Sequence, residues 1–323
     1  MKKLLLSLLY LSLFTGIYAG ERFNFNASWL LKVGNINGAE SVKYDDGSWQ
    51  QVTLPYAFNG KEAFAVSIHD LSDTVMWYRK HFTLEKGMNA RHVFIEFEGA
   101  RQAAEVYLNG HYLGLNENGV TAFGFDLTPY IKKKGDNVIA VKVDNSWRYR
   151  EKATGSTFQW NDKNFNANYG GLSKNVWLHT TGDVYQTLPL YDNLRTIGTY
   201  IYTSDFDVAG HQATIHVESE VKNETKSQQT IGLEVEIIDL EGKTIARFKG
   251  RDMMVDADST GVCKASESIN GLHFWSWGYG YLYTVKTRLM IGGKCVDEVS
   301  TRTGFRKTNF DNAIVKINDR AIQ

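Results

Sequence analysis

The sequence predicts an all-β protein with two sandwich domains. Beyond residue 20, apolar and polar residues alternate along many short segments, which is the period of a half-buried strand. No segment of a dozen residues there carries the i, i+3, i+4, i+7 apolar stripe of an amphipathic helix. The 323 residues exceed what one hydrophobic core usually serves, so at least two domains are expected.

The N-terminal segment 1–19 has the pattern of a secretory signal peptide. Lys2 and Lys3 precede an apolar run that ends in the small residues Ala19 and Gly20. Serine and threonine interrupt this run, which is shorter than the about 20 apolar residues of a membrane-spanning helix. We therefore expect a periplasmic or secreted protein without a membrane anchor.

Residues 20–187 form the first predicted domain. Apolar residues occupy every second position in three of its segments, at 93–97, 105–108 and 139–143. Asn109-Gly110 separates two such strands and supplies the two positive φ angles that a tight hairpin turn requires. The size of the domain and its short strands favour a jelly-roll sandwich.

Residues 188–304 form the second predicted domain. Pro189 lies between the strand that ends near His179 and the next strand-rich stretch, which places the boundary. Alternation recurs at 215–221, 233–237 and 281–285. About 115 residues with this pattern suit an immunoglobulin-like sandwich.

Charge and composition exclude several classes of function. Lys plus Arg and Asp plus Glu number 36 each, so no basic surface for nucleic acid is expected. The eight histidines lack the spacing that directs two imidazoles at one metal, and Cys263 and Cys295 form no CxxC motif. We expect no metal and no cofactor. Whether the two cysteines pair in an exported protein remains open.

A long segment between the strands ending near Asp144 and beginning near Asn175 has no strand period. Ordered loops this long are uncommon in compact domains and are often functional. It combines aromatic side chains with a carboxylate and amides, which suit the apolar faces and hydroxyls of a sugar. The candidate substrate-binding residues are Asp162, Asn166, Asn168 and Tyr169. The alternative is that the aromatic residues plug the open end of the sandwich while the asparagines cap turns.

Two Asn-Glu pairs elsewhere are weaker candidates for a catalytic acid. Asn116-Glu117 and Asn223-Glu224 each lie in a predicted polar turn, far in sequence from a second candidate carboxylate. We expect both to be solvated turns. The sequence also lacks a nucleophile elbow and a Gly-rich phosphate loop, so it shows no reaction centre.

Several short motifs, taken in order, resemble the N-terminal, non-catalytic half of glycoside hydrolase family 2, which includes β-galactosidases, β-glucuronidases and β-mannosidases. They cover residues 52 to 306 in register. The motifs are Val52-Thr53-Leu54-Pro55-Tyr56, Trp77-Tyr78-Arg79-Lys80, Phe97-Glu98-Gly99-Ala100, Phe125-Asp126-Leu127-Thr128, Val141-Lys142-Val143-Asp144-Asn145, Asn168-Tyr169-Gly170-Gly171-Leu172, Tyr281-Leu282-Tyr283 and Gly304-Phe305-Arg306.

In that family, a jelly-roll sugar-binding domain and an immunoglobulin-like domain precede a (β/α)₈ barrel that carries both catalytic glutamates. The resemblance implies that residues 305–323 are the truncated start of this barrel and that the catalytic barrel is absent, so no catalytic residue is assigned to this chain. It also implies that the loop before Gly170-Gly171 touches the sugar. Relatives often have Asp near positions 165–167, whereas the nearest Asp here is Asp162. The sequence therefore does not indicate whether the sugar is galactose, glucuronic acid or mannose.

Two hypotheses follow from different classes of protein. In the first, the chain is the front part of an exported family 2 glycosidase that hydrolyses β-glycosidic bonds, and its partners are a β-linked carbohydrate and the catalytic barrel of the same polypeptide. In the second, it is a free-standing carbohydrate-binding or interaction protein without catalysis. The polar and apolar residues that follow Gly304 resemble the hairpin before the first barrel strand, which favours the first hypothesis.

Overall fold

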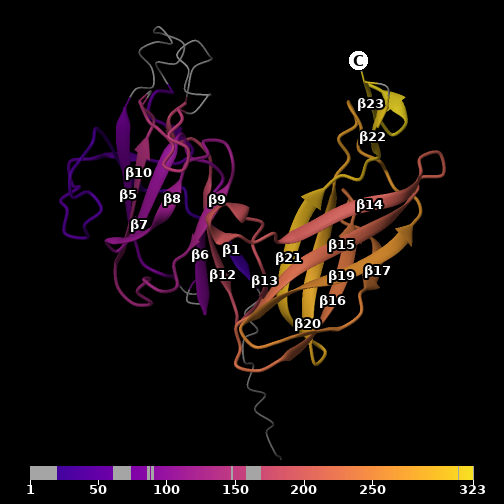
Figure 1. Ribbon diagram of the computed structural model, residues 1–323. Coiled ribbons are helices and arrows are strands. Elements are labelled where there is room, and N and C mark those ends of the chain that lie inside the picture. The colour runs from indigo at the N-terminus through magenta and orange to yellow at the C-terminus, as the bar shows by residue number, and fades with distance from the viewer. Residues whose placement is uncertain are drawn as a thin grey trace, which may run out of the picture.

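The computed structural model describes residues 20–60, 74–85, 88, 91–146, 148–157, 169–311 and 313–322. These residues form antiparallel strands and a single four-residue helical turn, α1 (Tyr191–Leu194). Two β-sandwiches lie side by side, with the C-terminal strands at one end of the second (Figure 1). The all-β prediction is confirmed, and the described ranges contain no β/α barrel. The predicted signal peptide 1–19 lies outside them.

The first sandwich consists of a six-stranded sheet in the order β3-β2-β5-β10-β7-β8, a four-stranded sheet in the order β1-β12-β6-β9, and the short pair β11-β4. Its strands are β1 (Glu21–Asn24), β2 (Trp29–Val33), β3 (Gln50–Val52), β4 (Tyr56–Ala57), β5 (Val75–Phe82), β6 (His92–Phe97), β7 (Ala103–Leu108), β8 (His111–Asn116), β9 (Phe123–Asp126), β10 (Asn137–Asp144), β11 (Gly171–Leu172) and β12 (Val176–Thr181).

Inward-facing apolar residues of the two main sheets form the core of the first sandwich. On β6, Val93, Ile95 and Phe97 are fully buried, as their alternation predicts. The hairpin between β7 and β8 turns through Asn109 and Gly110, whose φ angles are 52° and 84°. Both positive angles that the dipeptide predicts are therefore present.

The second sandwich packs a sheet of β13, β14, β15 and β19 against a sheet of β16, β17, β18, β20 and β21. Its strands are β13 (Val184–Gln186), β14 (Thr199–Asp207), β15 (Gln212–Asn223), β16 (Gln229–Ile238), β17 (Thr244–Lys249), β18 (Met253–Val255), β19 (Ser259–Ile269), β20 (Tyr283–Ile291) and β21 (Lys294–Thr303). Residues of β15 alternate between buried and half-buried along its whole length. The inward-facing apolar residues of these two sheets form a second core, separate from that of the first sandwich. The jelly-roll and immunoglobulin-like prediction is confirmed.

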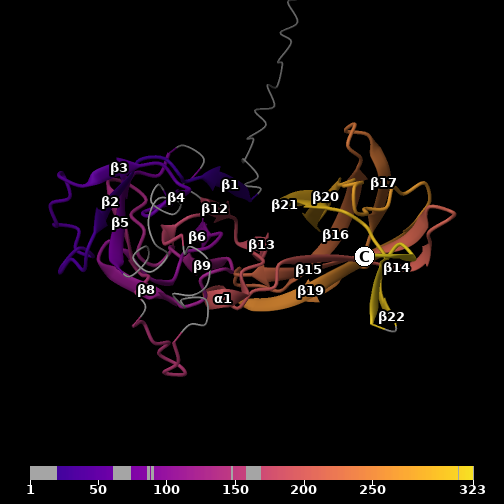
Figure 2. The same cartoon turned by 90° about the horizontal axis from the view of Figure 1, so that it is seen from above.

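The junction between the sandwiches is short. Strand β13 pairs with β15 of the second sandwich although it precedes residue 188. The helical turn α1 lies against β9 of the first sandwich (Figure 2). Neither cysteine forms a disulfide, and Cys263 is buried in the second core.

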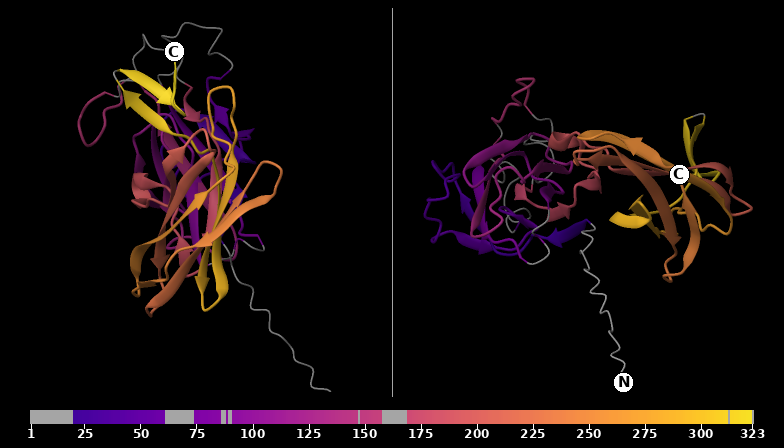
Figure 3. Two further views of the ribbon diagram at one scale, coloured as in Figure 1. Left: turned by 90° about the vertical axis from the view of Figure 1, so that its right-hand side faces the viewer. Right: turned by 90° about the horizontal axis from the view of Figure 1, so that it is seen from below.

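The C-terminal segment forms a small sheet in the order β22-β23-β24 (Figure 3). These strands are β22 (Thr308–Asp311), β23 (Ile314–Ile317) and β24 (Arg320–Ala321). Asn318 joins them to the second sandwich, because its side-chain amide donates to the carbonyl of Trp275 at 3.0 Å. Within the described part of the chain, no helix has the length and apolarity needed to cross a membrane.

A buried ion pair fixes the segment before β3 onto the six-stranded sheet. The side chain of Arg79 on β5 is fully buried, and its Nε donates to Oδ2 of Asp46 at 2.7 Å. The same carboxylate lies 2.9 Å from Nε2 of His81, whose Nδ1 lies 3.1 Å from Asp136. Burial opposes the charged forms, yet these contacts lower the pKa of Asp46 and raise the pKa of His81.

We expect replacement of His81 by Asn to destabilise the protein most at acidic to neutral pH. A raised histidine pKa gives stability that is fully present below the unfolded value of about 6.5 and is lost as pH rises through the folded value. The thermal midpoints of wild type and variant should therefore converge from pH 6 to pH 8.5.

The control is His111→Asn, because the His111 ring stacks on Tyr130 and has no ion-pair partner among the described residues. A difference in thermal midpoint between wild type and His81→Asn that stays constant across this pH range would contradict the prediction.

Candidate functional site

The predicted sugar-binding loop leaves the first sandwich after β10 and returns at β11. Asp162, Asn166 and Asn168 lie outside the described residues, so their role stays a prediction. Tyr169 is described and is 40% exposed, immediately before the returning strand. The geometry of the site therefore rests on the two ends of the loop, which lie at the same end of the molecule as β22 and β23 (Figure 1).

Glu117 anchors the outgoing end of the loop. Its Oε1 accepts a hydrogen bond from the hydroxyl of Tyr149 and another from the backbone N–H of Lys152 at 2.7 Å. Burial and the adjacent carboxylate raise the pKa of Tyr149, so this hydroxyl stays protonated and remains a donor. Asn116, which precedes Glu117, is 4% exposed at the end of β8. The expectation of a solvated Asn116-Glu117 turn is wrong, because a segment more than 30 residues away in sequence folds over it.

Gly170 and Gly171 anchor the returning end. Gly170 donates its N–H to Oδ1 of Asn59 at 3.1 Å, and Gly171 exchanges two backbone hydrogen bonds with Arg101 at 2.7 and 2.9 Å. A Cβ at Gly170 would lie 2.5 Å from the ring of Phe58, and one at Gly171 would lie 2.1 Å from the hydroxyl of Tyr78. The φ angle of Gly171 is 101°. Only glycine fits this close approach, so the Gly-Gly pair has a structural cause.

Buried polar groups lie below the returning end. Gln102 is fully buried, and neither atom of its side-chain amide has a hydrogen-bond partner among the residues that the structure describes. Asn145, the first residue after β10, is also fully buried. Burial lowers the pKa of the neighbouring Arg101. The sequence analysis missed Gln102 because it lies among small residues in a segment without any catalytic motif.

The second Asn-Glu pair is also structural. Asn223 is fully buried at the end of β15, and its side-chain amide donates to the carbonyls of Ser227 and Val255 at 2.9 and 3.0 Å. Glu224 accepts a hydrogen bond of 2.7 Å from the hydroxyl of Tyr185 on β13. The expectation of a solvated turn is wrong here too, because both side chains hold neighbouring segments together.

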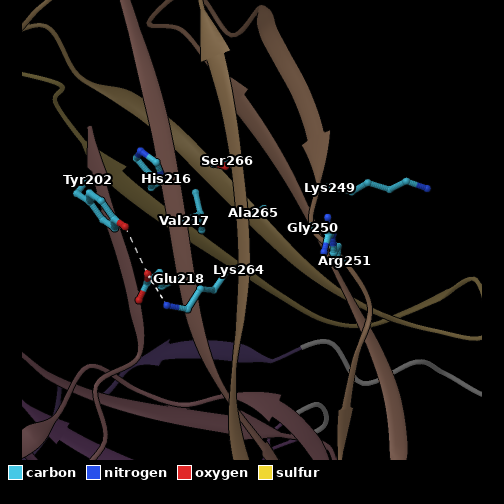
Figure 4. Close-up of a pocket in the computed structure, with 10 residues that line it drawn as sticks. All are labelled: Tyr202, His216, Val217, Glu218, Lys249, Gly250, Arg251, Lys264, Ala265 and Ser266. Atoms are coloured by element: carbon cyan, nitrogen blue, oxygen red, sulfur yellow. Dashed lines mark hydrogen bonds and ion pairs between the residues drawn. The ribbon is translucent and has the colours of Figure 1, made fainter. Parts of the chain in front are cut away.

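A hollow of about 300 Å³ lies on the second sandwich, over β15 and β19 (Figure 4). The ring of Tyr202 stacks on His216, with ring centroids 4.7 Å apart, and Glu218 lies 2.9 Å from Nζ of Lys264. Lys249 points away from this group (Figure 4). These residues face one another on adjacent strands, so cross-strand pairing explains the cluster without a ligand.

A larger hollow of about 840 Å³ separates the second sandwich from the C-terminal sheet. Its lining includes Phe206, His273, Tyr279 and Arg320. Residues of the first sandwich line neither hollow. Within the described ranges, no three His, Cys, Asp or Glu side chains gather in a way that could hold a metal ion.

Comparison with protein families gives two matches, which together cover most of the chain. Residues 31–182 match the model of the sugar-binding domain of glycosyl hydrolases family 2. Residues 196–306 match a second model of glycosyl hydrolases family 2. The two matched ranges coincide with the two sandwiches.

Individual proteins are similar to this chain in sequence and in structure over most of its length. A β-glucuronidase of Formosa agariphila is 35% identical over 306 residues, which are 91% of this chain and 31% of that protein. A β-galactosidase of Bacteroides ovatus is 28% identical, over 90% of this chain and 32% of that protein. The solved structure of a β-glucuronidase from glycoside hydrolase family 2 superposes with a TM-score of 0.82 at 33% identity, over 94% of this chain and 32% of that one. The chain spans about a third of the length of these relatives.

We expect Gly171→Ala to destabilise the first sandwich by about 3 kcal/mol, since the new methyl group meets the Tyr78 hydroxyl in a strained backbone conformation. The control is Gly155→Ala, where φ is 69° and no atom lies within 4 Å of the added Cβ. That variant should cost only about 1 kcal/mol. Urea unfolding of both variants checks this, and equal losses would show that the close approach at Gly171 is unimportant.

Proposed function

The chain belongs to glycoside hydrolase family 2, and we propose that it is the non-catalytic portion of an exported β-glycosidase. In this proposal the catalytic barrel belongs to the same polypeptide, and the enzyme hydrolyses β-glycosidic bonds. Two of its relatives, a β-glucuronidase and a β-galactosidase, support this reaction class. The N-terminal pattern of residues 1–19 supports export to the periplasm or the cell exterior.

The loop between β10 and β11 is the proposed contribution of this chain to the sugar site. The observation that carries the proposal is the rigid attachment of both ends of the loop, by Glu117 on one side and by Gly170-Gly171 on the other. Anchored ends hold the residues between them near one position, which a sugar-contacting loop requires. The C-terminal sheet lies at the same end of the molecule, so a domain that follows it would approach this loop (Figure 1).

The chemistry of the loop fits carbohydrate rather than the other ligand classes. Its amides and its carboxylate offer donors and acceptors for hydroxyl groups, and Tyr169 offers an exposed ring for an apolar sugar face. Asp162, Asn166 and Asn168 are the proposed polar contacts. The free-standing binding protein remains the second hypothesis. Sequencing the DNA downstream of codon 323 separates the two: an in-frame or frameshifted barrel supports the first, and an unrelated gene after a clean stop supports the second.

We expect the chain of 323 residues alone to show no glycosidase activity and to bind sugar with a Kd of about 1 mM or weaker. A retaining glycosidase needs two carboxylates about 5 to 5.5 Å apart, and Asp162, the one carboxylate proposed to contact the sugar, cannot serve as both acid/base and nucleophile. One wall of a shared site also leaves most of a ligand in water. Aryl β-glucuronide and β-galactoside assays with NMR titration test this, and turnover that survives purification to homogeneity would contradict it.

In a full-length relative, replacing the residues equivalent to Asn166 and Asn168 by Ala should lower kcat/KM by about tenfold to a hundredfold. The loss of hydrogen bonds to the sugar is the reason, so the thermal midpoint should change little. The control is the position equivalent to Gln51, an exposed amide on β3. If the double-alanine variant unfolds and the fraction that stays folded has normal activity, the loop is a structural plug and does not contact the sugar.

A further inference from the structure

Asp297 on β21 is a buried carboxylate at the junction of the two sandwiches. It is 2% exposed, and its Oδ2 accepts hydrogen bonds from the backbone N–H and the side-chain amide of Gln186 at 2.9 and 3.2 Å. The Gln186 side chain is itself held by Ser219 at 2.9 Å and Thr287 at 2.6 Å. Every one of these partners is neutral.

The other carboxylate oxygen of Asp297 reaches the first sandwich. Oδ1 accepts a hydrogen bond of 2.9 Å from the backbone nitrogen of Gly20, the residue before β1. A Cβ on residue 20 would lie 2.6 Å from this oxygen, so a larger residue there would have to displace the Asp297 carboxylate. Strand β1 lies beside β21 in two perpendicular views (Figures 1 and 2).

Among the described residues, no Lys, Arg or His nitrogen lies within ion-pair distance of Asp297. Buried charges in proteins are almost always paired, because their desolvation is costly. Burial outweighs the neutral donors and raises the pKa of Asp297. The site therefore has a carboxylate, a set of fixed donors and no positive charge.

The nitrogen atom that contacts this carboxylate is the one that a signal peptidase would free. The sequence pattern predicts cleavage between Ala19 and Gly20. Hydrolysis breaks this peptide bond, water supplies the hydroxyl of the new Ala19 carboxyl group, and the Gly20 nitrogen becomes an α-ammonium. The hydrogen bond between Gly20 and Asp297 then becomes an ion pair at the same two atoms.

We propose that Gly20 is the first residue of the processed protein and that its α-ammonium is the ion-pair partner of Asp297. Proteolytic processing thus completes the contact between the two sandwiches. The inference rests on the removal of residues 1–19 in the proposed function and is independent of any sugar chemistry. It assigns a role to the side chain of Asp297.

The ionisable side chains next to Asp297 on β21 contact other partners and not its carboxylate. Glu298, the next residue on β21, pairs with Arg288 at 2.6 Å and Lys286 at 3.6 Å. The thiol of Cys295 donates to the backbone carbonyl of Asp297 and not to its carboxylate, and burial raises the pKa of that thiol. The groups whose titration changes the pair are therefore the free amine at Gly20 and Asp297 itself, whose pKa is raised by burial.

The first experiment identifies the mature N-terminus of the exported protein by mass spectrometry. The expected result is a protein that begins at Gly20. Cleavage at any other bond, or retention of residues 1–19 after export, overturns the proposal. Secretion of a protein made without residues 1–19 would instead contradict the role of this segment in export, which belongs to the proposed function.

The second experiment compares two proteins of residues 20–323, one with a free amine at Gly20 and one acetylated there. The free-amine form should have a thermal midpoint higher by at least about 3 °C at pH 7. A free α-amine titrates near pH 8, and pairing raises its folded pKa, so the advantage is full below pH 8 and is lost as pH rises through the folded value. The pH dependence of amine acylation should give a pKa above 8 for Gly20.

Asp297→Asn should abolish both the difference in midpoint and the raised amine pKa. The matched control is Glu298→Gln, which changes a neighbouring carboxylate that does not contact Gly20 and should leave both effects intact. Equal midpoints for the free and acetylated forms, or an unshifted amine pKa in the wild-type protein, overturn the proposal even if Asp297→Asn fails to fold.

Discussion

The close approach of the backbone at Gly170 and Gly171 is the constraint on which the candidate site depends. It allows β11 to pair with β4 and to exchange hydrogen bonds with Arg101, so the chain re-enters the sandwich at one fixed place. Glu117 fixes the chain where it leaves, through Lys152. With both ends held, the residues between them can differ among relatives without disturbing the strands below. A stable fold beneath a loop whose sequence is free to vary follows from this arrangement.

The two sandwiches fold around separate apolar cores, and among the residues that the structure describes no buried apolar cluster includes residues of both. Besides the aromatic contact of Tyr185 with Phe94, whose ring centroids lie 5.8 Å apart, polar contacts cross the junction. Gly20 donates to the buried carboxylate of Asp297 at 2.9 Å, and Thr121 donates to Asp192 of α1 at 2.6 Å. Hydrogen bonds are directional, whereas apolar contact is not. A junction of this kind favours one orientation, which a site built from more than one domain requires.

Local patterns predicted the strands, because alternation and the turn at Asn109-Gly110 depend only on residues close in sequence. Burial of a polar side chain depends instead on segments far away in sequence. Glu117 looks solvated until Tyr149 folds over it, and nothing near Gln102 reveals that it is enclosed. The candidate contacts Asp162, Asn166 and Asn168 came from composition and family resemblance, which indicate a sugar-binding loop but give no geometry.

Two buried ionisable residues, Arg79 and Asp297, differ in where their partners lie. The charge of Arg79 is neutralised inside its own sandwich by Asp46 at 2.7 Å. Asp297 has only neutral donors in its own sandwich, and the atom that reaches it from the first sandwich is the nitrogen of Gly20. In the proposed processed form, Asp297 receives its countercharge from that neighbour, because a buried charge is stabilised chiefly by pairing. The proposed ion pair would thus add an electrostatic contact to the aromatic contact of Tyr185 with Phe94 at the junction.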